Sequence, residues 1–120
     1  MTTPMCKEKY RYCFFHSIKM KYIIQVIKAR ASALKDGRVS EQYFPKGDFG
    51  KLQRFELFVG DREGLIDVWE NGFVSIDLIQ YIHNTDFIVL APTKMFDTNK
   101  DNERKELFEK LDFLFSRLEV

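Results

Sequence analysis

Residues 51–78 hold the pattern that most constrains the fold of this chain, because they read as three short strands joined by tight turns. The first strand, Gln53–Val59, alternates apolar and polar side chains as a half-buried strand does. A glycine-bounded turn separates it from a second strand, Leu65–Trp69. Glu70-Asn71-Gly72 is typical of a hairpin turn and leads into a third strand, Phe73–Leu78. The centre of the chain therefore predicts an antiparallel sheet.

The length of the second turn decides which side chains share a face of this sheet. A two-residue loop at Asn71-Gly72 scatters the apolar residues over both faces. A three-residue loop pairs Trp69 with Phe73 and needs Gly72 in the left-handed conformation that glycine adopts cheaply. We predict the three-residue loop, because a one-residue slip exchanges the buried and exposed faces. The apolar face then holds Ile66, Val68, Val74, Ile76 and Leu78, and the mixed face holds Leu65, Asp67, Trp69, Phe73, Ser75 and Asp77.

The flanking segments predict an α+β fold, with an antiparallel sheet and a C-terminal helix. Tyr22–Ala31 is ambiguous between helix and strand, and we predict a long strand because β-branched residues are dense there. Val39–Phe44 predicts a second strand. Phe87–Ala91 is a continuous apolar run, which predicts a strand buried on both faces and ended by Pro92. Asp101–Leu118 carries apolar residues at helical spacing and predicts the helix.

The chain has 120 residues, which is the size of one domain, and we expect that domain at residues 20–120. Residues 1–19 are predicted to be an N-terminal extension with an edge strand at Lys9–Phe14. Two cysteines are too few for a disulfide scaffold, so we expect a reduced, cytoplasmic protein. Cys13–Ala33 is interrupted by lysine and arginine and falls short of the roughly 20 apolar residues that span a bilayer. No membrane partner is therefore expected.

Neither a metal site, a cofactor nor a catalytic centre is predicted. Cys6, Cys13, His16 and His83 do not form the two tight ligand pairs that mark a structural zinc site. The segment Gly47-Asp48-Phe49-Gly50-Lys51 departs from a phosphate-binding Walker loop in its glycine spacing and in the residue after the lysine. No nucleophile, base and orienting group stand in a recognisable motif. The chain is therefore expected to act by binding.

A surface for single-stranded DNA or RNA is the first functional prediction. Such surfaces combine aromatic side chains, on which bases stack, with basic side chains along the phosphate path. The predicted contact residues are Trp69, Phe73, Phe58, Phe49, Lys46, Lys51, Arg54, Lys28 and Arg30, with Phe44 beside them. Asp67, Glu70 and Asp77 count against this interpretation, because carboxylates repel phosphate. The net charge of +1 favours neither a basic nor an acidic partner.

The order of the elements resembles an OB-fold over about Lys21–Ala91. The resemblance rests on a long first strand, the strands Phe55–Val59 and Leu65–Trp69 around a turn rich in Asp and Gly, a short helix, and a final strand at Asp86–Leu90. It implies a five-stranded barrel that often binds single strands across its second and third strands. Some OB-folds bind proteins, and a fold alone does not determine function.

A protein-interaction module is the alternative prediction, for example an immunity protein or a phage or host inhibitor that covers another protein. Trp69 and Phe113 are then the interface anchors, since Phe113 lies off the apolar stripe of the C-terminal helix. The two predictions differ in charge. A nucleic-acid surface should gather lysine and arginine around its aromatics, whereas a protein-binding patch can stay neutral or acidic.

Overall fold

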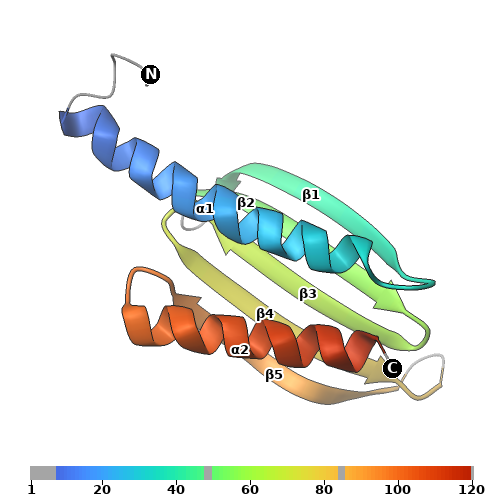
Figure 1. The fold of residues 1–120 in the computed structure, drawn as a ribbon. Helices are drawn as coiled ribbons and strands as arrows, with labels where there is room; N and C mark the ends of the chain where they lie inside the picture. The colour runs from blue at the N-terminus through green and yellow to red at the C-terminus, as the bar shows by residue number, and fades with distance from the viewer. Residues whose placement is uncertain (1–7, 48–49, 84–85, 120) are drawn as a thin grey trace.

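The computed structural model is an antiparallel sheet of five strands with two helices on one of its faces (Figure 1). It describes residues 8–47, 50–83 and 86–119, with side chains described from residue 20 onward. The elements are α1 (Glu8–Ser32), β1 (Arg38–Gly47), β2 (Gly50–Val59), β3 (Arg62–Trp69), β4 (Phe73–Tyr81), β5 (Phe87–Asp97) and α2 (Asp101–Leu118). The strands pair in the order β1-β2-β3-β4-β5, so β1 and β5 are edges and the sheet is open. The predicted α+β class is confirmed, and the predicted barrel-like closure is not.

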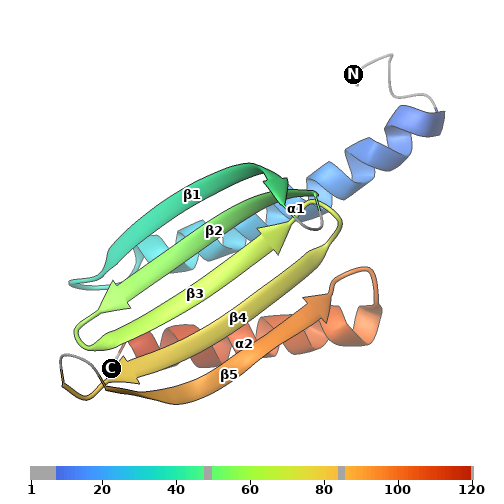
Figure 2. The same ribbon diagram turned by 180° about the vertical axis from the view of Figure 1, so that it is seen from behind.

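The central hairpin has the predicted three-residue turn and the predicted division of faces. Val68 pairs with Val74, and the backbone N–H of Gly72 donates to the carbonyl of Trp69 at 3.0 Å. Gly72 has a φ of 100°, which is the left-handed conformation that the turn requires. The predicted apolar set, Ile66, Val68, Val74, Ile76 and Leu78, is buried under the helices. Burial thus selects the register that places Trp69 and Phe73 together on the opposite face of the sheet. No described helix lies over that face, which we call the open face (Figure 2).

The strand predicted for Tyr22–Ala31 is wrong, because these residues belong to α1. The buried and partly buried apolar positions of α1 recur at helical spacing and continue into the loop that follows: Met20, Ile23, Ile24, Ile27, Ala31 and Leu34. Their packing against the sheet overrides the β preference of isoleucine, which is a weak local tendency. The edge strand predicted at Lys9–Phe14 is also wrong, since α1 begins at Glu8 and its first turns project past the sheet (Figure 1).

The helix α2 is confirmed over Asp101–Leu118, and it lies beside α1 on the same face of the sheet (Figure 1). Leu107, Leu111, Leu114, Phe115 and Leu118 form its buried stripe. Contacts between the helices include the ion pair of Arg30 Nη1 with Asp112 Oδ1 at 2.7 Å and the edge-to-face rings of Tyr22 and Phe108 at 6.3 Å. The guanidinium of Arg30 also lies 4.9 Å from the ring centroid of Phe115. In the described part of the chain, neither helix is long and apolar enough to cross a bilayer.

The strand β5 departs from its prediction in both length and burial. It continues through Pro92 to Asp97, with irregular pairing opposite Leu78. Proline is tolerated there because an edge strand needs no N–H on its outer side. The run Phe87–Val89 is exposed, so the predicted burial on both faces is wrong. The short helix expected after Leu78 is also absent between Ile79 and Tyr81, which continue β4.

Candidate protein-binding surface

The open face of the sheet carries a row of large apolar side chains at one end. Phe44, Leu52 and Trp69 are direct neighbours across β1, β2 and β3, and Phe73 follows on β4. No described helix covers this face (Figure 2). Phe58 lies on the same face but further along β2, where the guanidinium of Arg38 stacks 5.2 Å from its ring centroid. The predicted pairing of Trp69 and Phe73 on one face is therefore confirmed, with Phe58 set apart from them.

A bidentate ion pair occupies the middle of the open face. Arg54 Nε and Nη2 donate to the two carboxylate oxygens of Asp67 at 2.8 and 3.0 Å. Asp67 is only 5% exposed, and its hydrogen bond raises the pKa of Arg54. The guanidinium also lies 5.5 Å from the ring centroid of Phe44. Arg54 is the one predicted phosphate contact placed on this face by the strand pairing, and its charge is already matched by a carboxylate.

The other predicted basic residues do not join this face. Lys28 and Arg30 lie on α1, behind the sheet, where they pair with Glu41 and Asp112. Lys46 and Lys51 are exposed near the β1–β2 turn, at the end of the sheet. Phe49 lies outside the described residues. The basic track needed beside the aromatics is therefore dispersed over two sides of the molecule.

Carboxylates dominate the charge of the open face. Its strand residues include Arg38 and Arg54 as cations, and Glu56, Glu63, Asp67, Asp77 and Asp97 as anions. Burial raises the pKa of Asp77, and a 2.9 Å hydrogen bond from the Thr93 hydroxyl opposes that rise. Glu63 accepts a 2.6 Å hydrogen bond from the Tyr81 hydroxyl, which raises the pKa of Tyr81. A shallow hollow of about 420 Å³ lies between these carboxylates and the apolar side chains of Phe87 and Val89.

The tip of the β4–β5 hairpin is an exposed apolar surface that the sequence prediction missed. We call Tyr81, Ile82, Phe87, Ile88 and Val89 the hairpin patch. Phe87, Ile88 and Val89 are 53%, 45% and 54% exposed, and the rings of Tyr81 and Phe87 meet edge to face at 6.4 Å. Single exposed apolar residues are ordinary. Here Tyr81, Phe87 and Val89 share one face of the hairpin and Ile88 lies on the other, so exposed apolar side chains flank this edge on both faces. The apolar run at 87–89 is the sequence signal for this surface, although the run by itself predicts a buried strand.

The two edge strands differ in how they are protected. β1 carries charged residues along its length and Pro45 near its end, which are the usual devices against unwanted strand pairing. The first four residues of β5, Phe87 to Leu90, carry neither a charge nor a proline. An edge strand presents half of its backbone N–H and C=O groups outward. The beginning of β5 is thus a sheet edge open to another strand.

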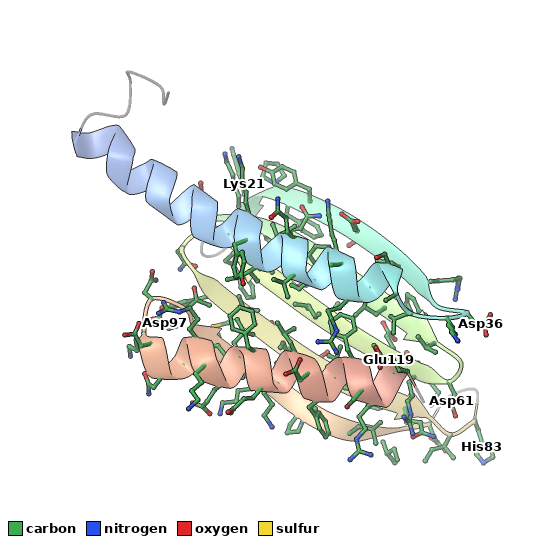
Figure 3. All side chains as sticks on the ribbon, viewed as in Figure 1. Lys21, Asp36, Asp61, His83, Asp97 and Glu119 are labelled. Carbon is green, nitrogen blue, oxygen red and sulfur yellow. The ribbon has the colours of Figure 1, made fainter. Side chains whose placement is uncertain are left out.

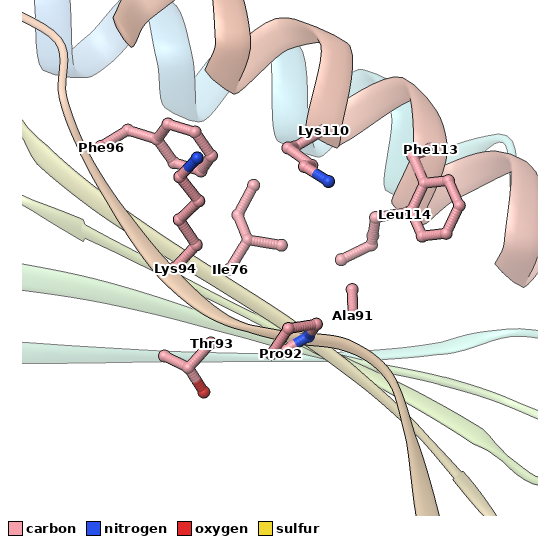
Figure 4. Close-up of a pocket in the computed structure, with 9 residues that line it drawn as sticks. All are labelled: Ile76, Ala91, Pro92, Thr93, Lys94, Phe96, Lys110, Phe113 and Leu114. Carbon is pink, nitrogen blue, oxygen red and sulfur yellow. The ribbon is translucent and has the colours of Figure 1, made fainter.

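A pocket of about 170 Å³ lies between α2 and β5, next to this edge (Figure 4). Ile76, Ala91, Phe96, Phe113 and Leu114 give it an apolar lining. Lys94 and Lys110 reach toward it from β5 and α2 (Figure 4). Phe113, predicted as an interface anchor, is partly buried here, on the side of the sheet away from Trp69. The two anchors predicted for a protein interface therefore belong to different surfaces.

The described residues hold no cluster of potential metal ligands. No group of three or more His, Cys, Asp and Glu side chains there is close enough to hold a metal ion. The side chains of Cys6, Cys13 and His16 lie outside the described part. His83 projects from the β4–β5 end of the sheet, away from the helices (Figure 3).

No protein-family model, curated protein or solved structure matches this chain.

Proposed function

We propose that the protein is a non-enzymatic binding module that recognises another protein through the hairpin patch and the adjoining edge of β5. The observation that carries the proposal is the run Phe87 to Leu90, which combines an unpaired sheet edge with three exposed apolar side chains. An added strand gains main-chain hydrogen bonds along such an edge, and its alternating side chains find apolar partners on both faces. This is the protein-interaction function expected as an alternative from the sequence, with a different set of anchors.

Single-stranded nucleic acid is the competing proposal, and the row of Phe44, Trp69 and Phe73 favours it. Bases stack on such rings with little regard to sequence. The charge of the same face opposes it, because phosphate binding derives from free lysine and arginine near the path of the strand. Arg54 is paired with Asp67, and Lys28 and Arg30 lie behind the sheet. Neither the proposed protein interface nor this competing surface depends on a closed OB-like barrel.

The test compares equivalent substitutions on the two edges of the sheet. Val89→Lys places a charge on the edge of β5, and Val39→Lys places one on the edge of β1, where Val39 is 40% exposed. Substitutions at exposed sites usually change stability by no more than about 0.5 kcal/mol, so both variants should stay folded. Tagged wild-type and variant proteins are used to capture partners from extracts of the source cells. The captured proteins are identified by mass spectrometry, and their affinity is then measured with purified partner.

The proposal expects a protein that binds the wild type and Val39→Lys but binds Val89→Lys at least about tenfold more weakly, as loss of an interface hot spot predicts. If Val39→Lys and Val89→Lys bind the partner equally well, the interface does not include the edge of β5. If the wild type forms a concentration-dependent dimer and only Val89→Lys loses it, the partner at this edge is a second copy of the chain. Quenching of Trp69 fluorescence by single-stranded oligonucleotides, weakening steeply with salt, would support the competing proposal.

A further inference from the structure

The pocket between α2 and β5 has the size and lining of a site for one apolar side chain. Its volume of about 170 Å³ compares with the roughly 150 Å³ apolar cavity that suffices to bind benzene in another protein. Ala91 leaves space on the β5 side because its side chain is a single methyl group, and Phe113 closes the α2 side (Figure 4). One aromatic ring or branched aliphatic group therefore fits, whereas a larger ligand would project into solvent.

The charge at the mouth of the pocket is positive. Lys94 Nζ lies 3.1 Å from Glu106 Oε2, so the charge of Lys94 is already balanced. Lys110 and Arg117 flank the ring of Phe113, with cation-to-centroid distances of 5.6 and 4.9 Å. Neither of these two cations forms an ion pair with another described residue. Lys110 lines the pocket itself, so a carboxylate attached to a bound apolar group would meet an unpaired ammonium.

The pocket continues directly from the proposed edge interface. Residues 91–94 of β5 line it, and they follow the exposed residues 87–89 on the same strand. Side chains alternate between the two faces of a strand, so a polypeptide paired along β5 points every second side chain toward the helices. On that face α2 packs over β5, so a side chain of an added strand would lie beside the pocket.

We infer that this pocket receives one aromatic or branched aliphatic side chain of the partner polypeptide, with a carboxylate close to that side chain placed against Lys110. The inference rests on the proposed function for the identity of the donor chain. The inference specifies what the partner must contain: an apolar residue that stands next to an acidic residue or next to the partner's own C-terminal carboxylate. The hairpin patch alone specifies no such charge.

The experiment uses two small probes that share an aromatic side chain and differ in charge, N-acetylphenylalanine and N-acetylphenylalanine amide. The isotope-labelled full chain is titrated with each, and amide chemical shifts are followed by NMR. We expect shifts centred on Ala91, Lys94 and Phe113, with the carboxylate probe binding about two- to fivefold more tightly, as one partly exposed ion pair contributes. Lys110→Gln should remove that difference, and the control Lys105→Gln, at an exposed site on the same helix, should keep it.

A filled pocket provides the second comparison. Ala91→Leu places a larger apolar side chain in the cavity, and both probes should then lose binding. Val89→Lys should bind the probes like the wild type, which separates failure of the pocket from failure of the proposed β5 interface. Equal affinity for the two probes in the wild type, shifts away from the pocket, or an absence of saturable binding would each overturn the inference. Because Lys110 is exposed, the Lys110→Gln result stands even if Ala91→Leu does not fold.

Discussion

Alanine substitutions at two adjacent residues of α1, Val26 and Ile27, test whether this segment packs as a helix or as the strand that the local sequence predicts. Ile27 is fully buried in the core, whereas Val26 is intermediate in exposure and packs outside the core cluster. Replacing a buried isoleucine with alanine costs about 2–5 kcal/mol, and the better helix propensity of alanine returns about 0.4 kcal/mol of this. For Val26→Ala a similar propensity gain offsets the small loss of contact, so the net change should lie within about 0.5 kcal/mol.

The free energy of unfolding of both variants is measured by urea titration, followed by far-ultraviolet circular dichroism and by Trp69 fluorescence. A loss of about 3 kcal/mol lowers the urea midpoint by about 1–3 M, for slopes of about 1–3 kcal/mol per molar. We therefore expect a large shift for Ile27→Ala and nearly none for Val26→Ala. In a strand, both β-branched residues would lose β propensity on replacement with alanine. Equal losses in the two variants would refute the helical packing of this segment.

Two further predictions concern the β3–β4 turn and the open face. Gly72→Ala should destabilise the fold more than Gly60→Ala in the same urea assay. Both glycines have a positive φ, so both variants carry backbone strain. Only at Gly72 would the added Cβ also crowd a neighbour, because it would lie 2.8 Å from Asn99, whereas Gly60 faces open space. Asp77→Asn should gain stability relative to the wild type as the pH rises above about 4. The pKa of Asp77 is raised in the folded protein, so the free energy of unfolding of the wild type falls as the pH rises from the unfolded-state pKa to the folded-state pKa. Asparagine does not titrate, so the variant has no such loss. Glu109→Gln, at an exposed site on α2, is the control, and parallel pH profiles for wild type and Asp77→Asn would contradict the second prediction.

Local sequence was sufficient for the central hairpin and for α2. The turn at Gly72 and the alternation of apolar residues on either side of it determine the register without reference to distant segments. The stripe from Leu107 to Leu118 likewise determines the buried side of α2. The shared face of Trp69 and Phe73 follows from the same local pattern, so this placement was predicted correctly.

Segments whose meaning depends on distant neighbours were predicted incorrectly. Isoleucines 23, 24 and 27 suit a strand or a helix, and only their packing against the sheet selects the helix. Once α1 is a helix on the covered face, Lys28 and Arg30 leave the predicted nucleic-acid surface. The run Phe87–Val89 is similar: an apolar strand is buried on both faces only when strands or helices surround it, and the strand order leaves β5 at an edge.

The two sides of the molecule differ in charge, and they therefore suit different parts of a binding partner. The open face holds its aromatic row among carboxylates, and Arg54 is already paired with Asp67. On the helix side, Lys110 lines the α2–β5 pocket and Arg117 lies against the ring of Phe113. Neither cation has a carboxylate partner among the described residues. The hairpin patch, at the start of β5, carries no charged side chain. A partner strand along β5 would therefore meet acidic groups with its side chains on the open face and basic groups with those on the helix face. Such a two-sided charge requirement discriminates among partners more strongly than apolar contact alone, because a charge on the wrong face is repelled as well as left unpaired.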